Sequence, residues 1–79
     1  MKFTAQNERK TTLKENGKLH RVYLKDISHI RSDSYLSIVH FIIEREPVIV
    51  SKLLKKFEVE LFENGFIRIN QSELVNCYI

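Results

Sequence analysis

The dipeptide Asn16-Gly17 constrains the fold of this 79-residue chain more than any other pair of residues. It separates two short segments, residues 11–15 and 18–24, in which apolar and polar side chains are interspersed. Asn and Gly readily adopt the positive φ angles that both central positions of a type I′ turn require. The sequence therefore predicts a β-hairpin. Its second strand has no wholly polar face, so it is either covered on both sides or close to a sheet corner.

Three further strands are expected before the predicted helix. Residues 25–28 suit a tight turn or a single helical turn, and residues 29–32 and 35–43 read as two strands around Asp33-Ser34. Residues 47–50 form a short β-branched run with Pro47 at its start, where the missing N–H does least harm. This segment is predicted to be a fifth strand.

One amphipathic helix is predicted at about residues 52–63. Apolar side chains fall at positions i, i+1, i+4 and i+8, namely at Leu53, Leu54, Phe57 and Leu61. Ser51 is the expected N-cap, and Asn64-Gly65 is the expected left-handed C-terminal stop. Residues 66–69 and 74–79 then read as strands around a turn at 70–73. The fold class is therefore mainly β, with a tail or linker at residues 1–10 and one domain at 11–79.

Neither export, membrane insertion nor catalysis is indicated. The chain has no apolar run long enough for a signal peptide core or a membrane span, and its single cysteine, Cys77, excludes an internal disulfide. We expect a cytoplasmic protein in which Cys77 is a buried, inert thiol. His20, His29 and His40 match no compact metal-ligand spacing, and no glycine-rich phosphate loop is present. No catalytic residue, metal site or cofactor is predicted.

Positive charge is concentrated in the N-terminal part of the chain. Residues 1–31 hold eight Lys or Arg against three acidic residues, whereas residues 32–79 hold five against seven. Clustered positive charge favours binding to a phosphate backbone. The alternative is a solvated surface without an anionic partner.

A cluster of polar residues suits contact with DNA. Arg68, Asn70, Gln71 and Ser72 lie at one junction of strand and turn. Arg can neutralise a phosphate or read guanine, Asn and Gln can pair with adenine, and Ser can bond a phosphate. The alternative is that Arg68 is solvated and the other three residues only make turn hydrogen bonds.

The same segment resembles the signature of the LytTR-type (LytR/AlgR-like) DNA-binding domain of bacterial response regulators. That signature is roughly Phe-x-Arg-x-His-x-Ser-x-x-Val-Asn with a later Ile, and the matching residues are Phe66, Arg68, Ser72, Val75, Asn76 and Ile79. Residues 53–61 are similar to the helix of the family, and residues 25–38 resemble its Asp-Ile-x-x-Ile hairpin. The resemblance covers about residues 11–79. It departs from the family at Asn70, where a His is usual, and the family continues for about one further hairpin, so the domain is expected to be C-terminally incomplete.

Membership would imply an elongated fold of small antiparallel sheets that binds double-stranded DNA through loops in successive major grooves. It would also imply transcription regulation in a two-component system, as a homodimer on repeated half-sites and often behind a receiver domain. The positions carried over are a first loop at Ser32, Asp33, Ser34 and Tyr35, a second loop at Asn70, Gln71 and Ser72 with Arg68 beside it, and Lys55 near backbone phosphates.

Two other functions stay open. The chain could be a non-catalytic protein-interaction or dimerisation β module that has lost DNA binding, with an open sheet edge for a partner. RNA binding is the third possibility and the least favoured, because the aromatic residues fall mostly at core-like positions rather than on a stacking platform.

Overall fold

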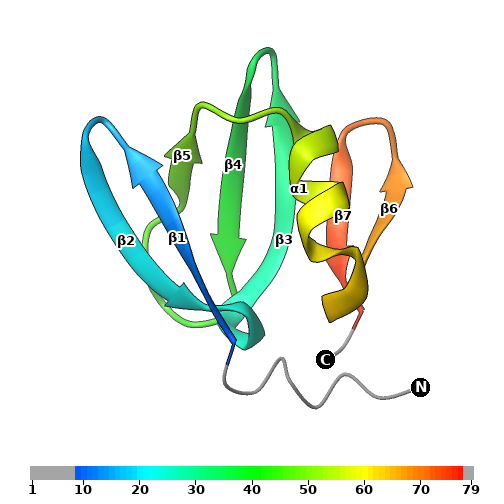
Figure 1. Ribbon diagram of the computed structural model, residues 1–79, viewed down its shortest axis with the longest axis horizontal. Helices are drawn as coiled ribbons and strands as arrows, with labels where there is room; N and C mark the ends of the chain where they lie inside the picture. The colour runs from blue at the N-terminus through cyan, green and yellow to red at the C-terminus, as the bar shows by residue number, and fades with distance from the viewer. Residues whose placement is uncertain (1–8, 78–79) are drawn as a thin grey trace.

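The computed structural model describes residues 9–77, and this part of the chain is mainly β-structure (Figure 1). A two-stranded antiparallel sheet pairs β1 with β2, and a five-stranded antiparallel sheet has the order β5-β4-β3-β7-β6. The elements are β1 (Lys10–Glu15), β2 (Lys18–Tyr23), a 3-10 helix (Leu24–Asp26), β3 (Ile27–Asp33), β4 (Leu36–Phe41), β5 (Val48–Val50), α1 (Leu54–Leu61), a second 3-10 helix (Phe62–Asn64), β6 (Phe66–Asn70) and β7 (Glu73–Asn76). The predicted fold class is confirmed.

The first hairpin forms as predicted. Asn16 and Gly17 have φ angles of 50° and 82°, and Glu15 pairs with Lys18 on either side of the turn. β1 begins at Lys10, one residue earlier than expected. In β2, Val22 is buried while Leu19 is 69% exposed, so the strand is covered on one face only.

The turn of the second hairpin lies one residue later than the sequence suggested. β3 continues through Asp33, which pairs with Leu36, so the turn consists of Ser34 and Tyr35. Ser34 has a φ of 60°, a left-handed conformation that small polar residues adopt at modest cost. The predicted turn at Asp33-Ser34 was therefore wrong by one position.

One face of the five-stranded sheet carries the core. Ile30 on β3 is the cross-strand partner of Val39 on β4 and of Leu74 on β7, and all three side chains are fully buried. Cross-strand partners share a face of the sheet. The helix α1 lies across this face through Phe57, and the β1-β2 hairpin adds Leu13 to the same cluster.

The helix is shorter than predicted and begins without a side-chain cap. Leu53 is the N-cap residue in extended conformation and makes no side-chain cap hydrogen bond, so the prediction of Ser51 as N-cap was wrong. Because Leu53 precedes the first helical turn, its side chain is 49% exposed, whereas Leu54, Phe57 and Leu61 are buried. Gly65 ends the segment with a φ of 89°, as predicted.

The last described strand anchors the chain through Asn76. Its side chain is 2% exposed, and its Nδ2 donates to the backbone oxygens of Leu24 at 3.3 Å and Ile27 at 2.9 Å. Cys77 follows the strand and is exposed, so the expected buried thiol was wrong. Most of the predicted tail, residues 1–8, and the end of the predicted last strand, residues 78–79, lie outside the described residues.

Candidate nucleic-acid interface

Four connections gather at one end of the molecule. Figure 1 shows the β1-β2, β3-β4 and β6-β7 turns and the β5-α1 connection at the upper end of the view. Grooves join neighbouring connections: one is lined by Gly17 and Ser51 among others, and a second by Ser51 and Tyr35. The backbone N–H of Ser32 donates to the carbonyl oxygen of Ser72 at 2.8 Å. We call this end the turn edge; it brings together the two loops that the sequence predicted to face DNA.

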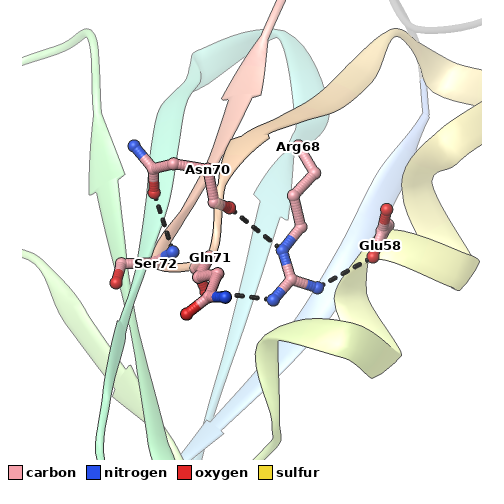
Figure 2. A network of polar contacts seen from close by, with 5 residues as sticks. All are labelled: Glu58, Arg68, Asn70, Gln71 and Ser72. Carbon is pink, nitrogen blue, oxygen red and sulfur yellow. Dashed lines mark hydrogen bonds and ion pairs between the residues drawn. The ribbon is translucent and has the colours of Figure 1, made fainter.

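The second loop, residues 70–72, is shaped by hydrogen bonds from its own segment (Figure 2). The side-chain Oδ1 of Asn70 accepts from the backbone N–H of Ser72 at 2.7 Å. Asn70 Nδ2 lies 3.5 Å from Glu73 Oε1, a weak contact. The amide of Asn70 is thus engaged within the turn.

Arg68 reaches into the loop from β6. Its Nε donates to the carbonyl oxygen of Asn70 at 3.2 Å, and its Nη2 donates to that of Gln71 at 3.0 Å. Its Nη1 donates to Oε1 of Glu58 on α1 at 2.9 Å. These bonds use three of the five N–H groups of a guanidinium. The contacts therefore favour a loop-supporting role for Arg68 over a purely DNA-contacting one.

All three loop residues are exposed, but the amide of Asn70 is engaged within the turn, which leaves Gln71 and Ser72 to present their side chains to solvent. A Gln amide offers one donor and one acceptor in the spacing that adenine presents in the major groove, and a Ser hydroxyl can bond a phosphate or a base edge. The geometry thus separates the loop into a structural part, Arg68 and Asn70, and a presented part, Gln71 and Ser72.

The first loop forms the tip of the β3-β4 hairpin. Tyr35 is 80% exposed, and Asp33 and Ser34 are exposed beside it. Ser32 is half-buried, since its backbone is bonded to the second loop. A carboxylate such as that of Asp33 repels phosphates but can accept from the amino group of cytosine. Lys55 belongs to neither loop and is exposed on the first turn of α1.

The three histidines belong to β2, β3 and β4 and to neither loop. His20 Nε2 is 3.2 Å from Glu15 Oε1, and His29 and His40 form a cross-strand pair with stacked rings whose centroids are 4.5 Å apart. Within residues 9–77, no group of three or more His, Cys, Asp or Glu side chains could hold a metal ion. None of the helices described there is long and apolar enough to cross a membrane.

The stacked pair is expected to make stability depend on pH. Burial, the neighbouring His29 and the charge of Arg31 lower the pKa of His40 below its usual value of 6.5, with Glu73 opposing them. The unfolded chain then binds more protons near this pH than the folded one, so stability is complete above about pH 6.5 and falls as the pH drops toward the folded-state pKa.

An NMR titration of the folded protein is expected to give His40 a pKa below the usual value. Urea midpoints of wild type should fall between about pH 7.5 and pH 6, and the change should be smaller in His40→Gln. A raised His40 pKa, or an undiminished change in the variant, contradicts the prediction.

Two contributions to this end of the molecule escaped the sequence reasoning. Ser51 and Lys52 lie in both grooves of the turn edge, and Glu58 contacts Arg68 from the helix. No local pattern could have paired Glu58 with Arg68, because the contact depends on how α1 packs over β6. Ser51 and Lys52 lie at the turn edge because the chain reverses direction between β5 and α1, and no local pattern shows this.

The family comparison assigns most of the chain to one family of DNA-binding domains. Residues 17–78 match the family model LytTR, described as the LytTr DNA-binding domain. No curated protein and no solved structure matches the chain. The matched segment covers well over half of the sequence and includes both loops and α1. The chain therefore belongs to the LytTR DNA-binding domain family.

Proposed function

We propose that the chain binds double-stranded DNA sequence-specifically by placing loops 32–35 and 70–72 into the major groove, and that it acts without catalysis. The observation that carries this proposal is the 2.8 Å hydrogen bond from Ser32 N to Ser72 O, which holds the two loops side by side. Rigid strands behind both loops can present polar side chains to base edges without a recognition helix. The regulatory setting we propose is a bacterial two-component system, in the cytoplasm and behind a receiver domain.

The roles differ between the residues of the interface. Gln71 and Ser72 read bases from the second loop, while Arg68 and Asn70 hold that loop in shape. Ser32, Asp33, Ser34 and Tyr35 form the contact surface of the first loop. Lys55 neutralises a backbone phosphate next to the groove, since an exposed ammonium suits a phosphate as a point charge.

The salt dependence of binding tests the proposal. A duplex selected by the wild-type protein from a randomised library serves as the specific probe, and a scrambled duplex of the same composition serves as the non-specific probe. Titrations of both at several salt concentrations are expected to show log K falling with log salt by about 0.9 for each phosphate contacted, and tighter binding of the selected duplex. A flat salt response, or equal affinity for both duplexes, contradicts sequence-specific DNA binding.

Gln71→Ala and Lys55→Ala form a matched pair that separates base reading from phosphate binding. Gln71→Ala is expected to weaken binding to the selected duplex by about 1–3 kcal/mol, with little effect on the scrambled duplex. Lys55→Ala is expected to weaken binding to both and to reduce the salt slope by about 0.9. If Gln71→Ala weakens both duplexes equally, the second loop does not read bases.

A second candidate function, self-association, is favoured by the two edge strands of the five-stranded sheet, β5 and β6. Ile49 on β5 and Ile67 on β6 are 45% and 49% exposed, on the face opposite the core. An edge strand with an exposed apolar side chain can pair with a strand of another chain. We propose a homodimer on repeated half-sites as its role alongside DNA binding. Sedimentation with and without the selected duplex separates the candidates: association that ignores DNA favours an interaction module.

A further inference from the structure

The ion pair between Glu58 and Arg68 connects the helix to the loop proposed to read DNA. Glu58 Oε1 accepts from Arg68 Nη1 at 2.9 Å, and both side chains are partly exposed, at 37% and 29%. The same guanidinium donates to the carbonyl oxygens of Asn70 and Gln71. Figure 2 shows Glu58 and the loop on opposite sides of the guanidinium. One arginine thus links α1 to two successive peptide groups of the loop.

The shape of the guanidinium turns this link into a geometric constraint. The group is planar and rigid, so a contact along one edge fixes the directions of its other N–H groups. Holding two adjacent carbonyl oxygens limits the rotation of the peptide groups around Gln71, and with it the direction in which its side chain leaves the backbone. Without Glu58, the arginine loses its charged anchor on α1 and is free to leave the loop.

We propose that Glu58 is a positioning residue for loop 70–72, which acts through Arg68 to fix the backbone from which Gln71 meets the bases. The inference rests on the proposed function and assigns a specificity-determining role to a residue that contacts no DNA. The proposal and simple electrostatics predict opposite effects when the negative charge of Glu58 is removed. An acidic group near a phosphate-binding surface ordinarily weakens binding, so its removal should tighten it. Positioning predicts the opposite for the selected duplex.

The test compares Glu58→Gln with Glu63→Gln. Glu63 is an exposed acid in the 3-10 helix that follows α1, so both variants remove one negative charge. A partly exposed ion pair contributes little to stability, so both variants should fold, which circular dichroism checks. Glu58→Gln is expected to lower the ratio of affinities for the selected and scrambled duplexes by about tenfold, whereas Glu63→Gln leaves that ratio unchanged.

Variants of Arg68 show whether the two residues act as a unit. Arg68→Lys keeps the charge but loses the planar fork, and it is expected to lose as much discrimination as Glu58→Gln, with an unchanged salt slope. The double variant should discriminate no worse than either single variant. The proposal is overturned if Glu58→Gln behaves like Glu63→Gln, or if it tightens binding to both duplexes.

A measurement without DNA separates this proposal from the proposed function. In NMR spectra of the free protein, Glu58→Gln is expected to shift the backbone amide resonances of residues 70–72, and Glu63→Gln is not. If the wild-type protein fails to prefer the selected duplex but these shifts appear, the proposed function fails and the positioning of the loop stands. If the shifts are absent, the positioning role is refuted whatever the protein binds.

Discussion

Phe57→Ala is expected to lower the free energy of unfolding by about 3–5 kcal/mol, because it empties the centre of the core. Phe57 is 1% exposed and is the largest side chain through which α1 packs on the five-stranded sheet. Small domains of this size are stable by only about 5 kcal/mol or little more. The variant should therefore be largely or partly unfolded at room temperature, which urea denaturation followed by circular dichroism will measure.

Phe62→Ala is the matched control for this prediction. Phe62 follows α1 in the 3-10 helix and is 65% exposed, so the same truncation removes little buried surface. Its effect on the free energy of unfolding should stay within about 0.5 kcal/mol. Similar losses for both variants would show that the helix does not pack on the sheet through Phe57.

The consequence of losing Phe57 extends to the proposed interface. The helix lies over β6 and β7, the strands that carry loop 70–72, and it supplies Glu58 to Arg68. Phe57→Ala should therefore abolish discrimination between selected and scrambled duplexes together with the fold. Glu58→Gln should lower that discrimination by about tenfold and leave the fold intact. Comparing these two variants distinguishes the effect of the helix side that packs on the core from the effect of the side that contacts Arg68.

Local chemistry made much of the fold predictable. Asn16-Gly17 specifies its hairpin because few other dipeptides accept two positive φ angles, and Gly65 marks the end of the helical segment for the same reason. The start of the helix was less predictable. Ser51 has the right chemistry for an N-cap, but the chain remains extended at Leu53, and packing of Leu54 against the sheet decides where the helix begins.

The candidate site was predictable as a list of polar residues but not as an arrangement. The sequence indicated both loops, but it could not show that Ser32 and Ser72 are bonded, because this contact depends on β3 pairing with β7. The sequence also could not show that Arg68 and Gln71 have different roles, since both residue types can contact DNA. Only the tertiary contact with Glu58 shows that the guanidinium supports the loop.

Asn76→Asp is expected to destabilise the fold by about 2–5 kcal/mol at neutral pH, although it only replaces the side-chain NH2 group by an oxygen. Asn76 Nδ2 donates to the backbone oxygens of Leu24 and Ile27, and a carboxylate would turn an acceptor toward both. Burial beside two carbonyl oxygens also raises the pKa of the new carboxyl above its unfolded value. The folded variant then binds more protons than the unfolded one, so the variant loses stability as the pH rises through this range and regains part of it in acid, where a protonated carboxyl can donate once.

The matched variants for this prediction are Asn76→Ala and Asn16→Asp. Asn76→Ala removes both hydrogen bonds without adding a charge, so its loss relative to wild type should not change with pH. Asn16→Asp makes the same chemical change in an exposed turn whose geometry Asp also accepts, and it should cost less than about 0.5 kcal/mol. Urea denaturation of each variant beside wild type at neutral and acid pH measures the differences. An Asn76→Asp loss that stays constant with pH would mean that the new carboxyl escapes to solvent. An Asn76→Ala loss near zero would mean that the bonds from Asn76 to Leu24 and Ile27 do not hold the end of the first hairpin against the sheet.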